Sequence, residues 1–448
     1  MVTRIENYIT KIILRGVTFK MKKIFLIFLL GMMIILAISV VGFAEGVVLR
    51  FYGWGGPERI SRTQEVIELF EEKYPNVKIE PEWLGYGEYY QKMAVQAAGR
   101  NLPDIFQQDN RHILGYIDYL LNLNPYIEDN TLDLTDINYE MIILPGSHDG
   151  KVYGISLGSN ADCYIYDPEL FKKAGIEEPT PEWTFEDYAE KAKKINKALG
   201  IYADDPYGNI FNNIGGLCMY VRQHGKEVYD ISRQKLGYED DKLFADYFSK
   251  HADLIKDGVN TPPEISLGIN HSAFGEWLIT KKEAAMTPIS SNQLVAIVEA
   301  AGRPLSLVTY PNAVDQVRYG TFIKASMFVV AAKNTKYPEW AVKFIDFCTN
   351  DLEANKILLA ERGVPPSSKI REGIMPYLTD TEKQMIEFVS LLEEYSTPLP
   401  EGYYFPEENK KVMDVLSLKV LKILYGKLTP EEAAKEFREE ANKILAEN

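Results

Sequence analysis

Residues Val48–Arg62 read VLRFYGWGGPERISR, and this stretch decides how the chain is interpreted. An apolar run ends abruptly at Gly53-Trp54-Gly55-Gly56, and Pro57 then supplies a residue that commonly opens a helix. The pattern predicts a strand, a loop of small residues and a helix whose first backbone N–H groups are unpaired. Such a helix start attracts an oxygen-rich ligand, and the indole of Trp54 suits the C–H face of a sugar ring. The competing interpretation is a glycine-rich turn beside a core tryptophan.

Strands and helices alternate after this loop. A helix is predicted over Pro57–Tyr74, a strand over Val77–Trp83, a helix over Tyr86–Arg100 and a strand over Asp104–Phe106. Strict alternation implies a parallel sheet covered by helices, in which ligands bind at the carboxyl ends of the strands. We expect these ends to face one cleft. They carry Trp54 with Gly55, the turn from Trp83 to Tyr86, and the run Asp109, Asn110 and Arg111.

The polar and aromatic residues at these strand ends leave alternatives open. Carboxylates and amides direct hydrogen bonds as sugar recognition requires, but Asp109 could instead cap the helix that follows. Arg111 could bind a ligand carboxylate or pair with Asp109. Consecutive helical residues are separated by about 100°, so we expect only one of Tyr86, Tyr89 and Tyr90 to face the cleft.

The remainder of the chain continues the mixture of strands and helices. Lys151–Tyr166 is predicted as two extended segments that meet near Gly158-Ser159-Asn160, which suits a crossing between domains. Thr184 followed by Asp187 resembles a capping box, and Thr429-Pro430 opens a final amphipathic helix. Further predicted elements are a helix at 240–258, a buried strand at 284–286, a strand over Phe322–Ala332, a helix through 340–347 and a helix over Met413–Tyr425. The fold class is therefore α/β, and 448 residues are enough for two domains.

The first 44 residues form a secretory signal region. A basic segment that ends at Lys23 precedes an apolar run from Ile24 to Ala44, and Gly42-Phe43-Ala44 matches a small-x-small cleavage site. Because a basic segment should open such a signal, Met21 is the natural start and the residues before it are an upstream extension. We expect cleavage after Ala44 and export across the cytoplasmic membrane, with an uncleaved membrane anchor as the alternative.

Charge and motif content exclude several classes of function. The whole chain has a net charge of −15, and subtracting the +5 of residues 1–44 leaves −20, which disfavours nucleic acid as a partner. The five His residues show no paired metal-ligand spacing, and no calcium loop, Walker loop, Gly-x-Ser-x-Gly elbow or dinucleotide fingerprint is present. Cys163, Cys218 and Cys348 are too few for a disulfide framework and are predicted to be buried apolar residues. We therefore expect no metal, no cofactor and no catalytic residue.

Eight segments in a fixed order give the mature chain a specific resemblance. They are the exported N-terminus, the Trp54 loop with FEEKYPNVKIE at 70–80, GRNLPDIF at 99–106, YDPELFKKAGIEEPTPEWTFEDYAEKAKK from 166, KEAAM at 282–286, VVAAKNTKYPEWAVKFIDF from 329, GVPPSS from 363 and ILYGKLTPEEAAKEFREEANKIL from 423. Over nearly all of residues 46–448 the chain resembles the bacterial extracellular solute-binding proteins of family 1. These are the sugar-binding components of ABC importers and are related to maltose-binding protein.

The resemblance implies two α/β lobes of the type II periplasmic-binding-protein fold, joined by crossing hinge strands and able to close on a sugar between them. The implied N-lobe spans 46–155 plus 319–365, and the C-lobe spans 156–318 plus 366–448. A Gly is usual at Lys282 and a small residue near Lys324, where a cation could favour an acidic sugar. The matching positions for ligand binding are Trp54, Asp109 and Asn110 in N-lobe loops, Asn160 and Asp162 on the crossing segment, Gly215 and Gly216 in a C-lobe loop, and Ser291 and Asn292 after KEAAM.

Four more aromatic residues are candidate contacts. Trp183 and Trp277 could bind the ligand or pack in the core, and Tyr403 and Tyr404 could form a late rim of the cleft. The functional hypothesis is a monomeric, non-catalytic receptor outside the cytoplasmic membrane that captures a mono- or oligosaccharide and delivers it to an ABC permease. Two alternatives remain, namely a secreted carbohydrate-active enzyme, which would need two carboxylates flanking the scissile bond, and a peptide-binding receptor.

Overall fold

The computed structural model describes residues 46–109, 112–206, 215–400, 403, 405–406 and 408–447. Spatial contacts divide the chain into a small unit, Met1–Val48 with Tyr74–Lys78, and a large unit, Leu49–Lys73 with Ile79–Asn448. In the small unit, the backbone N–H of Val47 donates to the carbonyl of Asn76 at 2.8 Å. No helix among the described residues is long and apolar enough to cross a membrane, and the predicted signal at 1–44 lies outside them.

One sheet has five strands in the order β2-β1-β3-β13-β6. Its strands are β1 (Val47–Trp54), β2 (Val77–Leu84), β3 (Ile105–Gln108), β6 (Gly154–Ser156) and β13 (Phe328–Ala331). β1 runs parallel to β3 with Phe51 opposite Ile105, as the alternation of strands and helices predicts. β13 is antiparallel to both β3 and β6, so the sheet is mixed rather than wholly parallel. The early alternation of strands and helices does not predict that β13, a strand from much later in the chain, joins this sheet.

Amphipathic helices pack on this sheet because their apolar residues recur every three or four positions. The helices are α2 (Pro57–Lys73), α3 (Tyr86–Ala98) and α13 (Pro338–Asn350). α2 buries Phe70, and α3 buries Tyr89 and Met93. The ring of Phe344 in α13 lies 5.1 Å from that of Phe70 and 6.0 Å from that of Phe51 in β1, measured between centroids. The three aromatic rings therefore join two helices to the sheet.

A second sheet has four strands in the order β11-β8-β10-β9. Its strands are β8 (Asp162–Tyr166), β9 (Tyr202–Asp204), β10 (Ala284–Ser290) and β11 (Ser306–Val308). β8 is antiparallel to β10 and β11, with Tyr166 opposite both Met286 and Ser306, whereas β10 is parallel to β9. The predicted capping box of Thr184 and Asp187 is present and opens α7 (Phe185–Leu199).

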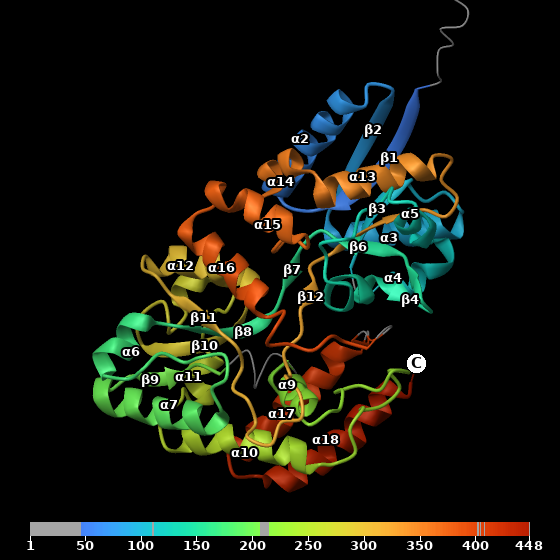
Figure 1. The fold of residues 1–448 in the computed structure, drawn as a ribbon. Coiled ribbons are helices and arrows are strands. Elements are labelled where there is room, and N and C mark those ends of the chain that lie inside the picture. Colours follow the sequence, from blue (N-terminus) through green and yellow to red (C-terminus); the bar gives the residue numbers. More distant parts are fainter. Residues whose placement is uncertain are drawn as a thin grey trace, which may run out of the picture. The chain divides into compact units, whose positions relative to one another are not determined.

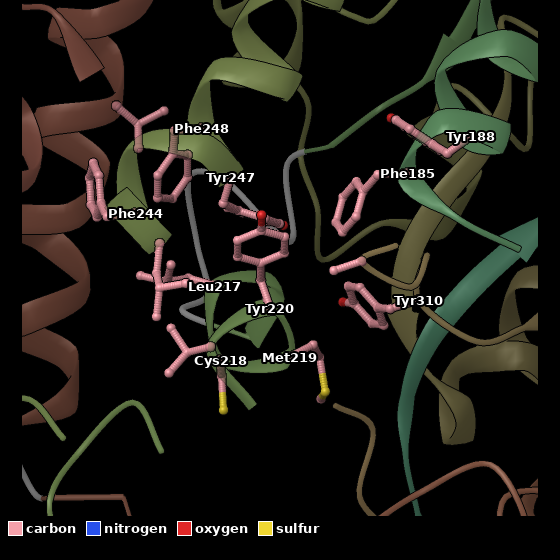
Figure 2. Close-up of a cluster of buried hydrophobic side chains, with 14 of the residues drawn as sticks. Phe185, Tyr188, Leu217, Cys218, Met219, Tyr220, Phe244, Tyr247, Phe248 and Tyr310 are labelled. Carbon is pink, nitrogen blue, oxygen red and sulfur yellow. The ribbon is translucent and has the colours of Figure 1, made fainter. Parts of the chain in front are cut away.

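Aromatic side chains fill the core beside the second sheet, as Figure 2 shows. The helices that contribute to it include α7, α9 (Gly215–Gln223), α10 (Lys242–Lys256), α17 (Asn409–Leu424) and α18 (Pro430–Leu445). Phe244 of α10 stacks on Phe437 of α18 with 5.2 Å between ring centroids, and α17 and α18 lie side by side (Figure 1). α18 starts at the predicted cap, where Thr429 and Glu432 form a capping box. The three cysteines are free and buried, as predicted.

Three passages of the chain meet at a pair of short strands. β7 (Ser159–Asn160) pairs antiparallel with β12 (Lys324–Ala325), and Ser159 also exchanges two backbone hydrogen bonds with Val364 at 2.7 and 2.9 Å. Gly158 is required here because a Cβ at this position would lie 2.0 Å from the carbonyl oxygen of Arg362. The segment that is predicted to cross between domains is thus hydrogen-bonded to two other segments. The division into lobes at 155, 318 and 365 stays a prediction.

Two stretches that are predicted to be extended contain several short strands in the structure. Lys151–Tyr166 contains β5 (Lys151–Val152), β6, β7 and β8, and Phe322–Ala332 contains β12 and β13. In the first stretch the chain leaves the five-stranded sheet at β6 and enters the β7–β12 pair, and in the second it leaves this pair at β12 and enters the five-stranded sheet at β13. The other described elements are α4 (Ile113–Tyr116), η1 (Ile117–Tyr119), α5 (Asn124–Glu128), η2 (Tyr139–Ile143), η3 (Leu144–Gly146), β4 (Ser147–His148), α6 (Pro168–Ala174), α11 (Pro263–Ser266), η4 (Phe274–Glu276), η5 (Ser291–Gln293), α12 (Leu294–Ala301), α14 (Leu352–Leu358), α15 (Ser368–Ile374), η6 (Met375–Tyr377) and α16 (Asp380–Leu391).

Candidate functional site

Five of the predicted ligand contacts lie on the wall of one cavity of about 730 Å³, here called the first cavity. Asp109 follows β3, Asn160 and Asp162 lie on β7 and β8, Asn292 follows β10, and Lys324 lies on β12. Tyr403, the predicted rim residue, is also on the wall. The sequence does not single out the remaining lining residues, which are Ser290, Phe322, Ala325, Ser326, Leu399, Phe405, Pro406, Asn409, Lys410 and Met413.

An ion pair between Lys324 and Asp162 forms part of this wall. The Nζ atom of Lys324 lies 2.5 Å from Oδ1 of Asp162, and the two side chains are 30% and 13% exposed. Lys324 lies opposite Asn160 in the β7–β12 pair, and Asp162 follows two residues later. Asp162 therefore balances the charge of Lys324, the cation that in the sequence suggests a preference for an acidic sugar.

Two buried polar atoms near this pair have no hydrogen-bond partner within the described part of the protein. They are Oδ1 of Asn160, whose residue is 8% exposed, and Oγ of Ser326. A buried polar group left unpaired costs about 1–3 kcal/mol, so such atoms are normally satisfied by protein, water or ligand. A ligand with hydroxyl groups could satisfy both atoms, because a hydroxyl can donate to an amide oxygen and can donate to or accept from a serine hydroxyl.

Aromatic side chains supply the apolar part of the wall. Phe322 and Tyr403 are buried, and Phe405 lies beside them on the lining. The hydroxyl of Tyr403 accepts a hydrogen bond from the backbone N–H of Tyr229 at 3.1 Å, which holds the ring in place. Burial raises the pKa of Tyr403 well above its usual range, so this hydroxyl stays neutral. Rings next to directional polar groups match the apolar faces and the hydroxyl rim of a sugar.

Arg222 of α9 holds two segments that lead into this wall. Its side chain is fully buried, and its Nε donates to the carbonyl of Gly320 at 2.7 Å. Its Nη1 donates to both carboxylate oxygens of Glu227 at 2.6 and 2.7 Å, and its Nη2 donates to the carbonyl of Thr397 at 2.8 Å. The guanidinium carbon lies 5.2 Å from the centroid of the Phe322 ring. One buried cation thus positions Phe322 and the start of the segment that carries Tyr403 and Phe405.

Asp109 and Tyr86, both predicted contacts, are joined to each other. The hydroxyl of Tyr86 donates to Oδ2 of Asp109 at 2.5 Å, and the backbone N–H of Asp109 donates to the hydroxyl of Tyr90 at 3.0 Å. Tyr86 is 40% exposed, whereas Tyr89 is fully buried, and which of the three tyrosines faces a ligand stays a prediction. The N-cap of the following helix, α4, is His112 rather than Asp109. Asn110 and Arg111 lie outside the described residues.

Trp54 ends β1 among three tyrosines and is only 9% exposed. Its ring centroid lies 5.6 Å from that of Tyr86, 4.9 Å from Tyr89 and 5.7 Å from Tyr90. Its backbone N–H donates to Oε1 of Gln107 at 2.6 Å. Trp54 is thus a member of the core beside the first sheet, and its role as a ligand platform stays a prediction. Gly55 is also outside the cavity lining, and a Cβ there would lie 2.4 Å from Cδ of Arg59.

The remaining predicted contacts are not among the lining residues of the first cavity. The indole N–H of Trp183 donates to the carbonyl of Thr309 at 2.9 Å, and that of Trp277 donates to the carbonyl of His271 at 3.2 Å. Both tryptophans are buried, which is the core alternative that the sequence leaves open. Gly215 and Gly216 are buried in the first turn of α9, and the Oγ of Ser291 accepts the backbone N–H of Ala161 at 3.1 Å. Ligand contact by these five residues stays a prediction.

The residues that sequence reasoning missed carry weak local signals. Phe322 precedes Lys324 by two positions, so the alternation of side chains along an extended segment could have placed it beside Lys324. Asn409, Lys410 and Met413 occupy the first turns of α17 and form no motif. In the described ranges no group of three or more His, Cys, Asp or Glu side chains is arranged to hold a metal ion.

Comparisons with known proteins show which proteins the chain resembles. A family model described as bacterial extracellular solute-binding protein matches residues 65–373. A solved extracellular solute-binding protein of family 1 from Alicyclobacillus acidocaldarius has a TM-score of 0.80 at 29% identity, covering 89% of this chain and 98% of that one. A periplasmic oligogalacturonide-binding protein from Yersinia enterocolitica has a TM-score of 0.75 at 21% identity, covering 90% and 99%. The arabinooligosaccharide-binding protein of Bacillus subtilis is 23% identical over 318 residues, which are 67% of this chain and 69% of the relative.

Proposed function

The chain belongs to the bacterial extracellular solute-binding proteins, and we propose that its solute is a carbohydrate bound in the first cavity. The observation that carries the proposal is that two buried atoms, Asn160 Oδ1 and Ser326 Oγ, have no partner among the described residues and lie on a wall that also holds Phe322. Sugar hydroxyls would satisfy the two polar atoms while the C–H face of the ring covers the aromatic side chain. Asp109, Asp162 and Asn292 supply further acceptors and donors.

The charge of the lining favours a neutral sugar over a uronic acid. Among the described lining residues, the charged side chains are Asp109, Asp162, Lys324 and Lys410, two of each sign. Lys324 is held by Asp162, and Lys410 pairs with Asp414 on the same helix. A ligand carboxylate would therefore have to compete with a protein carboxylate for either cation. Of the sugars bound by the two relatives above, the neutral arabinooligosaccharide fits this balance better than the galacturonide.

The receptor would act outside the cytoplasmic membrane and deliver its sugar to an ABC permease as a monomer. The family name implies an extracellular or periplasmic site of action. The basic and apolar segment before Glu45 supports export, and its small-x-small end supports cleavage after Ala44. N-terminal sequencing of the secreted protein tests this, with a mature chain that starts near Glu45 as the expected result.

The membership of a solute-binding family supports a binding role without catalysis. A glycosidase needs one carboxyl group whose pKa is raised so that it can act as an acid. Burial raises the pKa of the carboxyl groups of Asp204 and Asp346, and neither residue lines the first cavity. The proposal is therefore a receptor, with hydrolysis and peptide binding as the competing outcomes to test.

The decisive experiment combines binding and turnover on one set of ligands. Thermal shift and calorimetry would be run with arabino-, galacturono- and malto-oligosaccharides and with a pool of short peptides, followed by product analysis of each sugar. Saturable, stoichiometric stabilisation by a sugar without product supports the proposal. Sustained release of shorter sugars would show an enzyme, and stabilisation by peptides alone would show a peptide receptor.

A further inference from the structure

The segment Arg362-Gly363-Val364 contacts the wall of the first cavity, although none of its three residues is on the lining. It lies between α14 and α15, and Gly363 opens the GVPPSS stretch that contributes to the family resemblance. Val364 exchanges its two backbone hydrogen bonds with Ser159. The segment is therefore fixed to the chain directly beside Asn160, which carries one of the two unpartnered atoms of the wall.

Gly363 leaves the space that the side chain of Asn160 needs. Its φ is 100°, a backbone conformation that favours glycine. A Cβ at this position would lie 2.9 Å from Oδ1 of Asn160 and 2.9 Å from the carbonyl oxygen of Ser159. Any other residue would press on the amide of Asn160, so the backbone of Gly363 limits where this Oδ1 can lie.

Arg362 touches the chain on both sides of Ser326, which carries the other unpartnered atom. The backbone N–H of Ser326 donates to the carbonyl of Gly158 at 2.9 Å. Gly158 in turn packs on the carbonyl of Arg362, so closely that a Cβ would lie 2.0 Å from this oxygen. The Nη1 of Arg362 donates to Sδ of Met327, the residue after Ser326, at 3.0 Å. The backbone and the side chain of Arg362 thus both act on the surroundings of Ser326.

Two anchored groups hold the side chain of Met327. The first is the guanidinium of Arg362, whose Nη2 donates to Oγ1 of Thr63 in α2. The second is the amide of Gln107, whose Nε2 donates to Sδ of Met327 at 3.0 Å while its Oε1 accepts the backbone N–H of Trp54 in β1. Met327 is therefore tied to a helix and to a strand of the first sheet.

The guanidinium of Arg362 is costly to bury. The residue is 3% exposed, its Nε has no hydrogen-bond partner among the described residues, and the adjacent carboxylate of Glu361 pairs with Arg59 instead. Burial lowers the pKa of Arg362 to about 10. Its two acceptors are a hydroxyl and a thioether, both neutral. Because apolar residues often stabilise a protein when they replace buried charges, stability alone does not account for this side chain.

We propose that Arg362 is a positioning residue of the sugar site, which acts through Met327 and Gly158 to hold Oγ of Ser326 toward the ligand. Gly363 does the same for Oδ1 of Asn160. The inference rests on the proposed function, because these two atoms are positioned for the sugar that the first cavity binds. A wall that is held in this way is preorganised, so binding does not have to order it.

Arg362→Met separates positioning from stability. It keeps much of the length of the side chain and removes the charge, while Oγ1 of Thr63 keeps its own hydrogen bond to the carbonyl of Arg59 at 2.7 Å. The midpoint of urea unfolding should therefore stay the same or rise. The affinity for each arabino-, galacturono- or malto-oligosaccharide that binds the parent should fall about threefold to tenfold in calorimetry, because the released side chains must be ordered on binding. Arg362→Lys, which keeps the cation, should recover part of the loss.

Arg303→Met is the matched control at a buried arginine outside the lining of the first cavity. The Nε of Arg303 donates to Oδ2 of Asp167 at 2.8 Å, and Asp167 is fully buried. Removing the cation leaves this carboxylate buried without its partner, so the midpoint of urea unfolding should fall. The sugar affinity of the folded protein should not change.

A double-mutant cycle with Ser326→Ala tests whether Arg362 acts through Ser326. If it does, Arg362→Met should lower the sugar affinity less than twofold once the hydroxyl of Ser326 is gone. A purely structural role of Arg362 would instead give losses that multiply in the double variant. The cycle needs only the parent, the two single variants and the double variant, each titrated with the same oligosaccharide.

The outcomes that overturn the inference differ from the one that overturns the proposed function. Unchanged affinity in Arg362→Met or in Ser326→Ala, or losses that multiply in the double variant, would refute the positioning role while sugar binding stands. A loss of stability or of folding in Arg362→Met, like that in Arg303→Met, would assign the guanidinium to the structure and refute it as well. If no sugar binds to the parent protein, the proposed function itself fails, and the inference fails with it.

Discussion

Lys324 and Asp162 form an ion pair in the first cavity, with 2.5 Å between Nζ and Oδ1. Their positions differ by 162 residues, and the pairing of β7 with β12 brings them together. Because Lys410 also pairs with Asp414, each cation among the described lining residues has a carboxylate partner, and this balance is the reason for proposing a neutral ligand.

Replacing Asp162 with Asn should shift the preference of the protein toward acidic sugars. The substitution keeps the shape of the side chain but frees the ammonium group of Lys324, which could then pair with a ligand carboxylate. A hydrogen bond to a charged group contributes about 1.5–3 kcal/mol, so the affinity ratio of digalacturonic acid to arabinobiose should rise at least about tenfold. Calorimetry with both ligands measures the ratio.

The double variant Asp162→Asn with Lys324→Met is the control for this prediction. It removes the cation as well, so the affinity ratio should return toward that of the parent. A ratio that stays high in the double variant would mean that another group binds the carboxylate. An unchanged ratio in Asp162→Asn would show that Lys324 does not face the ligand.

Replacing Ser326 with Ala should weaken sugar binding without loss of stability. The Oγ atom of Ser326 is buried without a partner among the described residues, so its removal takes away a group that is desolvated in the unliganded protein. The free energy of unfolding should stay the same or rise slightly, while the binding free energy falls by about 0.5–1.5 kcal/mol, the value of one hydrogen bond. Urea unfolding and calorimetry on the same samples separate the two effects. A loss of stability with unchanged affinity would mean that the hydroxyl has a structural partner.

Replacing Trp54 with Ala should destabilise the protein as well as affect binding. The indole is 9% exposed and packs among Tyr86, Tyr89 and Tyr90, so its removal leaves a cavity in the core. Losses for buried Trp-to-Ala changes are about 3–5 kcal/mol in the free energy of unfolding. Urea titration measures this loss, and Trp54→Phe should recover part of it. If the midpoint of unfolding does not move, Trp54 is not a core residue and the platform interpretation gains support.

Asp204 should make the protein less stable as the pH rises above about 6.5. Burial raises the pKa of its carboxyl group from 3.8 to about 8, although the hydroxyls of Tyr188 and Tyr164 donate to Oδ2 at 2.6 and 3.2 Å. Between these two pKa values the folded protein holds a proton that the unfolded chain has released. Stability is therefore lost as the pH rises through this window, by at most about 1.4 kcal/mol per pH unit.

His251 acts in the opposite direction at lower pH. Burial lowers its pKa from 6.5 to about 4, so between these values the unfolded chain binds a proton that the folded protein lacks, and stability rises with pH. Up to about pH 6.5 the effects of His251 and Asp204 on stability oppose each other. Above this pH the effect of Asp204 is no longer opposed by that of His251. Measured by urea unfolding at pH 6.5, 7.25 and 8, the free energy of unfolding should fall with pH in the parent protein but not in Asp204→Asn. The same fall in both proteins would assign the slope to another group.

Much of the local structure could be predicted because it depends on residues close together in the chain. Helix periodicity predicted α2 and α3, and short-range hydrogen bonding predicted the capping boxes at Thr184 and Thr429, since both depend on spacings of three or four residues. The insertion of β13 between β3 and β6 could not be predicted in this way. Strand pairing across more than 200 residues depends on the whole fold and not on local pattern.

The candidate site was predictable only in part for the same reason. Strand-end position identified Asp109, and the resemblance identified Asn160, Asp162 and Asn292, all of which line the first cavity. Trp54 has the residue type and the position of a ligand contact, yet three tyrosines from α3 cover most of its surface. Burial is a property of the neighbours that the fold supplies, so residue type and spacing could not decide it.

The sequence by itself determined the α/β class, the helices and strands along the chain, and a resemblance specific enough to identify a solute-binding family. Only the tertiary structure decided that Lys324 is paired with Asp162, and that Asn160 and Ser326 carry buried atoms with no partner among the described residues. The physical reason is that local spacing determines which face of an element is apolar, whereas charge pairing, burial and cavity shape arise between segments far apart in the chain. Those contacts form when the sheets and crossing strands pack, and they set what the site can bind.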